Sequence, residues 1–83
     1  MEFIHERTRI YSTDEKGDVI AEVTFPETSP GVFTIEHTIV DSSLQGQGIA
    51  GKLVQAAVEE IRSRGGKVEA TCSYAIKWLD DHR

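Results

Sequence analysis

The hydrophobic period of this chain changes once, across a glycine-rich segment in its middle. Residues 32–40 form its most β-prone run, and residues 41–48 then break the β pattern. From residue 49 to residue 61 the apolar side chains recur with the period of an amphipathic helix. Gly65-Gly66 ends this helix, and residues 67–72 have the composition of another strand. A strand, helix, strand order of this length predicts a right-handed crossover between two parallel, neighbouring strands.

The segments before this crossover predict an antiparallel hairpin. Residues 7–12 and 19–25 are rich in β-forming side chains, and residues 14–18 supply turn chemistry between them. Residues 26–31 contain two prolines and a glycine, so we expect no regular structure there. Together with residues 32–40, the two strands predict a three-stranded antiparallel meander.

A short helix over residues 74–81, capped by Ser73, is expected to close the chain. The predicted fold class is therefore α+β, with an antiparallel β-meander, a βαβ crossover that makes a parallel strand pair, and a short C-terminal helix. With 83 residues the chain is predicted to be one domain, residues 1–83.

The charge balance restricts the classes of partner. The chain has 14 Asp and Glu against 9 Lys and Arg, a net charge of −5. This balance argues against binding to nucleic acid or an anionic membrane, because both require an electropositive face. A single cysteine, with no signal-peptide or membrane-spanning run, is typical of a cytoplasmic protein. No spacing of His, Asp and Glu resembles a metal site.

Residues 44–51, Leu-Gln-Gly-Gln-Gly-Ile-Ala-Gly, carry the strongest chemical signal. Glycines let the backbone turn sharply and let a ligand approach the main-chain amides. The first turn of a helix has N–H groups without partners, and its positive dipole end favours anions. The pattern predicts a phosphate or pyrophosphate site, although it does not fit a P-loop or a Rossmann fingerprint. A plain strand-to-helix loop without a ligand is the alternative interpretation.

Three motifs in the right order resemble those of one family. Residues 45–50, Gln-Gly-Gln-Gly-Ile-Ala, match Q/R-x-x-G-x-G/A, the acyl-CoA pyrophosphate loop of the GNAT N-acetyltransferases. Residues 35–40 resemble the "I-x-H-T-x-V" strand of the small YjdJ-type branch of that superfamily, and residues 71–75 resemble its "x-C-S-[YF]-A" segment. The chain is therefore similar to this branch in element order and, over residues 33–75, in motifs.

The resemblance implies acetyl-CoA, or another acyl-CoA, as cosubstrate. The exposed main-chain edge of Thr38, Ile39 and Val40 would pair with the pantetheine amides where the two parallel strands splay apart. Lys52 and Lys77 are the basic residues expected to meet the 3′-phosphate, unless they are simply solvated. The main-chain N–H groups expected to hold the pyrophosphate are those of Gln45, Gly46, Gln47, Gly48, Ile49 and Ala50.

Four residues near the expected splay are candidates for acyl transfer to an amine. His37 is a candidate base, although the alternation of residues 33–37 would turn it toward the core. Glu36 faces the other way and could act through a water, or be an exposed carboxylate. Cys72 could attack the thioester as a thiolate activated by the following helix, or be a small buried hydrophobic residue. Tyr74 could protonate the CoA thiolate, or pack beneath the last helix.

The predicted function is N-acetyl transfer from acetyl-CoA to an unidentified amine, by direct attack or through Cys72. Two alternatives stay open: a CoA-binding module without turnover, and an interaction domain that has lost the ligand. The CoA-binding module is favoured by the length of the chain. Full-length GNAT proteins carry N-terminal helices that help to form the acceptor site, and this chain has no room for them. The negative charge favours a cationic acceptor. We expect a monomer or a weak homodimer.

Overall fold

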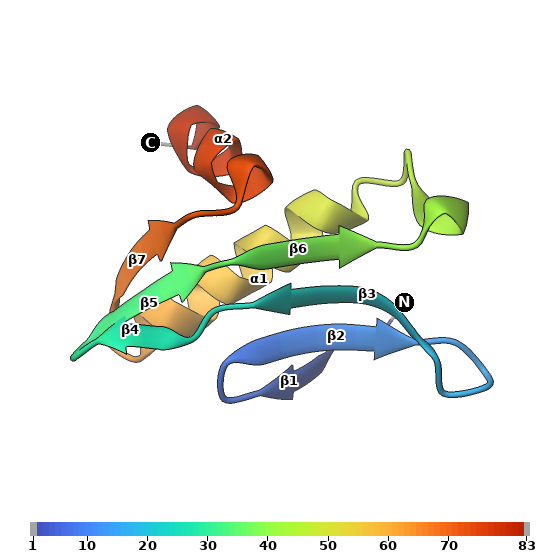
Figure 1. The fold of residues 1–83 in the computed structure, drawn as a ribbon, viewed down its shortest axis with the longest axis horizontal. Helices are drawn as coiled ribbons and strands as arrows, with labels where there is room; N and C mark the ends of the chain where they lie inside the picture. Colours follow the sequence, from blue (N-terminus) through green and yellow to red (C-terminus); the bar gives the residue numbers. More distant parts are fainter. Residues whose placement is uncertain (1, 83) are drawn as a thin grey trace.

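The computed structural model describes residues 2–82. A twisted sheet carries helix α1 against one face, and helix α2 lies beyond the end of β7 (Figure 1). Within residues 2–82, no helix is long and apolar enough to cross a membrane. The strands are β1 (Ile4–Glu6), β2 (Arg9–Thr13), β3 (Val19–Thr24), β4 (Glu27–Ser29), β5 (Val32–Ile35), β6 (His37–Val40) and β7 (Lys67–Ala70). The helices are the 3₁₀ helix η1 (Ser42–Leu44), α1 (Ile49–Ser63) and α2 (Ser73–Asp81).

The sheet topology confirms the predicted fold class. Strands β1, β2, β3 and β6 form an antiparallel sheet in that order. Strands β4, β5 and β7 form a second sheet, in which β5 and β7 are parallel neighbours joined through α1. Because β3 leads almost directly into β4, and β5 into β6, the two sheets are continuous along these strands (Figure 1).

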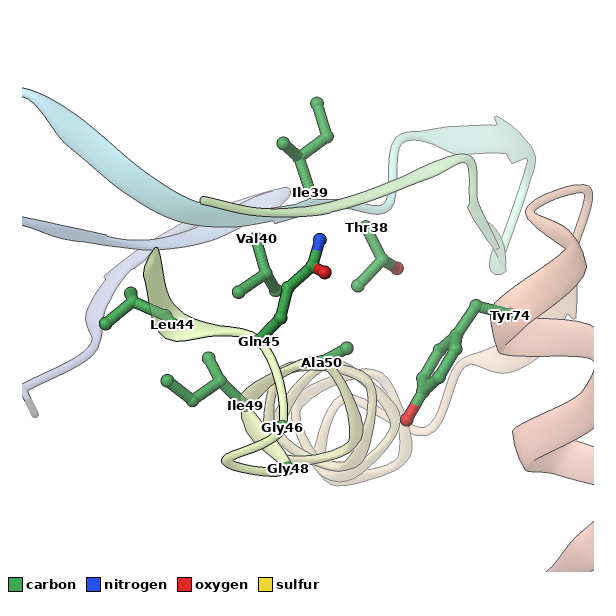
Figure 2. A pocket seen from close by; sticks show the side chains of 10 residues that line it. All are labelled: Thr38, Ile39, Val40, Leu44, Gln45, Gly46, Gly48, Ile49, Ala50 and Tyr74. Carbon is green, nitrogen blue, oxygen red and sulfur yellow. The ribbon is translucent and has the colours of Figure 1, made fainter. Parts of the chain in front are cut away.

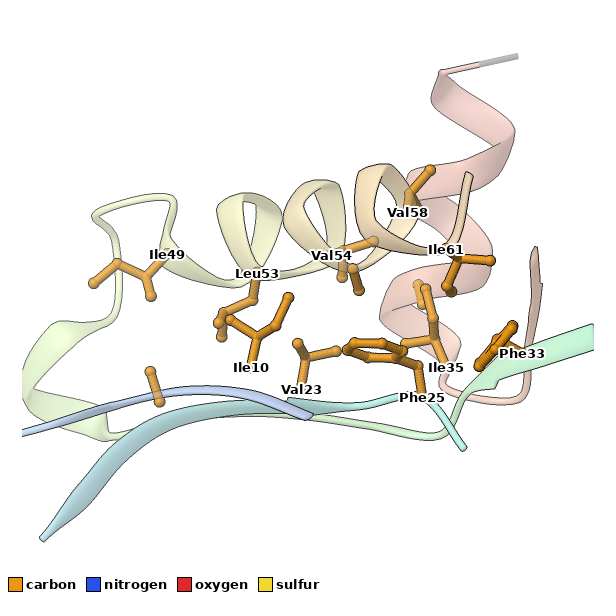
Figure 3. Packing of buried hydrophobic residues seen from close by; sticks show 13 residues of the cluster. Ile10, Val23, Phe25, Phe33, Ile35, Ile49, Leu53, Val54, Val58 and Ile61 are labelled. Carbon is orange, nitrogen blue, oxygen red and sulfur yellow. The ribbon is translucent and has the colours of Figure 1, made fainter. Parts of the chain in front are cut away.

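Helix α1 covers one face of the sheet and completes the core. Its predicted apolar stripe is buried, and Leu53, Val54 and Ile61 are fully enclosed. Ile10 on β2 and Phe25, just after β3, are fully buried beneath it (Figure 3). Burying a side chain of this size contributes about 1.5–3 kcal/mol relative to leaving it exposed. The helix stripe therefore fixes which face of the sheet is inside.

The expectation that residues 26–31 lack regular structure is wrong, because Glu27–Ser29 form the edge strand β4. An edge position tolerates a neighbouring proline, since its missing N–H is not needed on the outer side. The Pro26 carbonyl still accepts a hydrogen bond from the Thr34 N–H at 3.0 Å. The Thr28 and Thr34 hydroxyls are 2.7 Å apart, which adds a side-chain link between β4 and β5.

Strand β1 was not predicted either. Its three residues are all exposed, so no alternation of buried and exposed side chains marks it in the sequence. It pairs antiparallel with β2, for example Ile4 with Tyr11. The Ser12 hydroxyl, which is buried, donates a hydrogen bond to the main-chain carbonyl of Glu2 at 2.8 Å and holds the start of the chain in place.

A bulge at Glu36 divides the long strand predicted over residues 32–40 into β5 and β6. The carbonyl oxygen of Thr24 accepts a hydrogen bond from the Glu36 N–H at 3.0 Å, whereas the strand register pairs Thr24 with His37. Two residues on one strand therefore face one residue on the other, which is the arrangement of a β-bulge. The bulge adds a residue and shifts the alternation of every side chain after it.

The shifted alternation places His37 outside the core. Phe33 and Ile35 are buried, as expected, but His37 is exposed and Ile39 is 58% exposed. Thr38 lies opposite buried Val23 in the register, so its side chain points to the face that α1 covers. The expectation that His37 shares a face with Phe33 and Ile35 is thus wrong, and the bulge is the reason.

Gly66 has no room for a side chain. A Cβ atom there would lie 3.0 Å from Cγ2 of Ile61 and 3.0 Å from Cδ1 of Phe33. Gly66→Ala should lower the free energy of unfolding by about 1–3 kcal/mol, because the added methyl overpacks the core. Chemical denaturation measures the change, with Lys67→Ala at the exposed neighbouring position as a control that should shift stability by about 0.5 kcal/mol or less. Equal stability of Gly66→Ala and the wild type would contradict the packing described.

Candidate active site

A cavity of about 600 Å³ opens between β6, the loop before α1, and the start of α2 (Figure 2). The side chains of Thr38, Val40 and Gln45 form one side, the first turn of α1 forms the floor, and Tyr74 closes the side toward α2, whereas the Ile39 side chain points away. None of the lining residues carries a charge at neutral pH. The lining residues are Thr38, Ile39, Val40, Leu44, Gln45, Gly46, Gly48, Ile49, Ala50 and Tyr74.

The loop that enters α1 leaves main-chain N–H groups unpaired beside this cavity. Gly46 and Gly48 have φ of +84° and +73°, a left-handed conformation that favours glycine. Gly48 is the N-cap of α1, and no side chain caps the helix. The Lys52 N–H donates to the Gly48 carbonyl at 3.2 Å, so the first-turn N–H groups before it have no partner inside the helix. These donors and the positive end of the helix dipole suit an anion.

Asp41 orders the other end of this loop. Its carboxylate accepts a hydrogen bond from the Ser43 N–H at 2.9 Å and starts the 3₁₀ helix η1. That main-chain donor, with a further contribution from the Ser43 hydroxyl, holds the pKa of Asp41 below its usual range. The loop is therefore anchored by an ionised carboxylate where it leaves β6.

The parallel strands separate immediately after Ile35. The carbonyl oxygen of Ile35 accepts hydrogen bonds from the N–H groups of Thr71 and Cys72, at 3.0 and 3.2 Å. Beyond this point β7 has ended at Ala70 and the chain turns into α2, whereas β6 continues along β3 (Figure 1). The side of β6 that faces the cavity therefore has no strand beside it within residues 2–82.

The hydrogen bonds between β3 and β6 determine which main-chain groups of β6 point to its open edge. The N–H of Asp41 donates to the carbonyl of Ile20 on the β3 side at 2.8 Å. Hydrogen-bonding directions alternate along an antiparallel strand, so the main-chain groups of Val40 and Thr38 point to the open edge. An extended ligand that carries amides can pair with such an edge.

Cys72 lies at the base of the splay, next to β6. Its thiol donates to the Thr38 hydroxyl oxygen, with 3.7 Å between Sγ and Oγ1. Cys72, and not Ser73, is the N-cap of α2, so the expectation that Ser73 caps this helix is wrong. An N-cap side chain accepts from the second and third helical N–H groups, which here belong to Tyr74 and Ala75.

This capping position governs the acidity of the thiol. Burial by itself raises the pKa of Cys72, but the Ala75 and Tyr74 N–H groups and the hydroxyl and main chain of Thr38 stabilise the thiolate. Their combined effect is larger than that of burial, so the pKa of Cys72 lies below its ordinary value. The helix N-terminus that the sequence suggested as a source of activation is present and begins at Ser73.

Not all of the candidate residues border the cavity. Five candidates do not line it: Cys72, which is partly buried, and the exposed residues Glu36, His37, Gln47 and Lys52. Leu44, the first residue of the glycine-rich segment, was not predicted to bind the cofactor, but it lines the cavity and packs against the core. Lys77 is exposed on α2. Within residues 2–82, no group of three or more His, Cys, Asp and Glu side chains could hold a metal ion.

The contact between Thr38 and Cys72 leads to a prediction. Thr38→Val removes the hydroxyl that stabilises the thiolate, so the pKa of Cys72 should rise. The thiolate fraction at neutral pH then falls, and alkylation by iodoacetamide at pH 7 should slow several-fold while its pH midpoint moves upward. Thr71→Val is the matched control, because Thr71 is an exposed threonine directly before Cys72. Identical pH profiles for Thr38→Val and the wild type would contradict the assignment.

Similarity to known proteins agrees with this geometry. Residues 9–83 match the sequence profile of the family described as GCN5-related N-acetyl-transferase. The NMR solution structure of a GCN5-like protein from Staphylococcus aureus is 32% identical in sequence, with a TM-score of 0.79. That match covers 98% of this chain and 79% of the other. No curated protein matches the chain.

Two longer proteins contain the same fold. The IAA acetyltransferase from Bacillus cereus is 27% identical with a TM-score of 0.67, over 88% of this chain and 51% of that one. A GCN5-related N-acetyltransferase from Sphaerobacter thermophilus is 24% identical with a TM-score of 0.68, over 77% of this chain and 21% of that one. This chain thus spans about half or less of these two proteins and about four-fifths of the Staphylococcus protein. The family match over residues 9–83 and the shared fold show that this chain belongs to the GCN5-related N-acetyltransferase family.

Proposed function

We propose that this protein transfers an acetyl group from acetyl-CoA to an amine, with residues 1–83 acting as one acetyl-CoA-binding domain. One observation carries the proposal. The uncapped first turn of α1 and the open edge of β6 border the same cavity. The first offers donors to a pyrophosphate, and the second offers main-chain partners to the amides of pantetheine.

The pyrophosphate would lie at the start of α1. The N–H groups of the first turn and of the glycine loop would donate to its oxygens, and the helix dipole adds a favourable field. No carboxylate lines the cavity, so nothing there repels the anion. The Gln45 amide extends from the loop toward Thr38 and Val40 and offers a further polar contact (Figure 2).

The pantetheine arm would run along β6 from Val40 toward Thr38. Pairing with the open edge at these two residues would lead the thioester away from the α1 loop and toward Cys72. The Tyr74 ring borders this path from the α2 side. The reactive end of the ligand would therefore lie close to Tyr74 on α2 and to Cys72, the N-cap of α2. Tyr74 can transfer a proton, and Cys72 can act as a nucleophile.

Two routes for the acyl group fit these positions. In direct transfer, the neutral amine attacks the thioester carbonyl, the carbon–sulfur bond breaks, and the CoA thiolate takes a proton from Tyr74. The proton that the amine nitrogen loses returns through water to the Tyr74 phenolate. In the covalent route, the Cys72 thiolate attacks the carbonyl and the carbon–sulfur bond to CoA breaks, so CoA leaves as its thiolate. The neutral amine then attacks the acyl-cysteine, its nitrogen gives up a proton to solvent, and the Cys72 thiolate is released again. The lowered pKa of Cys72 supports the second route. We assign no role to His37, because the bulge turns it to the face of β6 opposite Thr38.

A binding module without turnover is the second candidate. It is favoured by the absence, among the residues that line the cavity, of a side chain that acts as a base at neutral pH. Binding of acetyl-CoA is common to both functions, and only acyl transfer separates them.

Binding can be tested with a matched pair of glycine variants. Gly48→Ala and Gly17→Ala both place a methyl group at positive φ, +73° and +87°, with nothing within 4 Å of the new Cβ. Both should lose about 1–2 kcal/mol of stability. Only Gly48 borders the cavity, so only Gly48→Ala should weaken acetyl-CoA binding, by roughly tenfold or more through distortion of the anion loop.

An NMR amide titration with acetyl-CoA measures this affinity and locates the site. In the wild type, shifts should concentrate at residues 38–40 and 45–50. The absence of shifts at millimolar acetyl-CoA would overturn both candidate functions. Equal weakening by the two glycine substitutions would show that the loop at Gly48 has no special part in binding.

Mass spectrometry of the same sample separates the two routes. A covalent intermediate adds about 42 Da, the mass of an acetyl group that replaces hydrogen. Cys72 is the single cysteine of the chain, so Cys72→Ala should abolish the adduct. CoA release with an amine present, but with no adduct and with full activity of Cys72→Ala, would favour direct transfer.

A further inference from the structure

Gly51 lies on α1 opposite Tyr74 and Trp78 of α2, and a side chain there would meet both of them. An ideal Cβ on Gly51 would lie 3.2 Å from the Tyr74 hydroxyl oxygen and 3.9 Å from Nε1 of Trp78. The first distance is too short for a relaxed contact, whereas the second is an ordinary van der Waals contact. Gly51 has ordinary helical φ, so the backbone alone would accept any residue. The hydroxyl of Tyr74 is therefore the atom that a side chain at position 51 would displace.

Gly51 lowers the stability of helix α1. Glycine in a helix interior weakens the helix relative to alanine, because it loses more backbone freedom on folding. Gly51 is the third residue of α1, in the turn whose N–H groups border the cavity. Gly51 therefore weakens this turn relative to alanine and leaves space beside it.

The space is filled by the polar end of Tyr74. Tyr74 and Trp78 are four residues apart on α2, so they lie on the same face of that helix, toward α1. Figure 2 shows the Tyr74 ring inclined from α2 with its hydroxyl directed to α1, near Ala50. Tyr74 as a whole is 44% exposed, so its ring is not enclosed by the core. Gly51 is the neighbour that sets how closely the hydroxyl approaches α1.

We propose that Gly51 is a positioning residue for Tyr74: its missing side chain lets the Tyr74 hydroxyl reach α1 on the side of the cavity across from Thr38, beside the proposed path of the thioester, where it can protonate the departing CoA thiolate. This inference rests on the proposed function, because the proton acceptor is the thiolate of CoA. A methyl group at position 51 would displace the hydroxyl by a few tenths of an ångström. Proton transfer is sensitive to such a displacement, whereas ligand binding along β6 is not.

A four-protein cycle tests the contact by stability, without any ligand. The proteins are the wild type, Gly51→Ala, Tyr74→Phe and the double variant. In the Tyr74→Phe background the offending oxygen is gone, so Gly51→Ala should lower the unfolding equilibrium constant about fivefold through better helix propensity. With Tyr74 present, the gain should be reduced or reversed. Gln55→Ala, one turn further along α1 and exposed, should have the same effect in both backgrounds.

The same four proteins test the role in turnover. Gly51→Ala should lower kcat by roughly threefold to tenfold while the acetyl-CoA affinity stays unchanged. In the Tyr74→Phe background it should have no further effect on kcat. Trp78 is the single tryptophan, so its indole N–H resonance reports whether the α1–α2 contact has moved. That resonance should stay close to its wild-type position in Gly51→Ala.

The outcomes separate this inference from the function on which it rests. If the wild type binds and turns over acetyl-CoA, but Gly51→Ala acts equally with Tyr74 and with Phe at position 74, the inference is wrong and the proposed function stands. A large shift of the Trp78 indole would also overturn it, since the two helices would then have moved apart. If the wild type binds acetyl-CoA but transfers no acetyl group, no thiolate departs and the inference is wrong. If acetyl-CoA does not bind, both proposals fail together.

Discussion

The carbonyl oxygen of Ile35 accepts two main-chain N–H groups, those of Thr71 and Cys72, and the whole site depends on this junction. It is the last main-chain link between the parallel strands. Beyond it one chain becomes a helix and the other remains a strand, so β6 is left with an unpaired edge. An unpaired edge beside an uncapped helix start leaves main-chain hydrogen-bonding groups available to a ligand in place of water. Acetyl-CoA, with a pyrophosphate and two amides, is the kind of molecule that satisfies both at once.

The Glu36 bulge determines which side chain of β6 faces Cys72 at this junction. Without the extra residue, the alternation of β5 would continue and His37 would point to the face that α1 covers. With it, Thr38 takes that direction and reaches the thiol of Cys72. The bulge thus places the hydroxyl of Thr38, and not the imidazole of His37, next to Cys72. A neutral hydroxyl can support a thiolate there without adding a titrating group of its own.

Much of this architecture can be predicted from the sequence, because it follows from the spacing of apolar side chains. The apolar stripe of α1, the hairpin around residues 14–18 and the parallel pair were all predicted and are present. The bulge was not, since residues 32–40 are uniformly β-prone and the extra residue is set by a hydrogen bond to Thr24, a residue distant in sequence. The helix cap was misplaced by one residue, because Ser73 is the commoner capping type and cysteine is not a usual one. Strand β4 was missed because its proline is harmless only at an edge.

The position of Cys72 has a consequence for the helix that follows it. The structure shows no capping hydrogen bond from the Cys72 side chain, but the Tyr74 and Ala75 N–H groups that lower its pKa would hold an ionised thiol, so the thiolate would also stabilise the start of α2. Its folded-state pKa is depressed, so this stabilisation is complete above the pKa of an unfolded cysteine and is lost as the pH falls through the folded-state value. Any reaction that consumes the thiolate's charge, whether acylation, alkylation or oxidation to a neutral form, would also remove this stabilisation. Chemistry at this sulfur would therefore loosen the first turn of the helix that carries Tyr74, and restoring the thiolate would tighten it again.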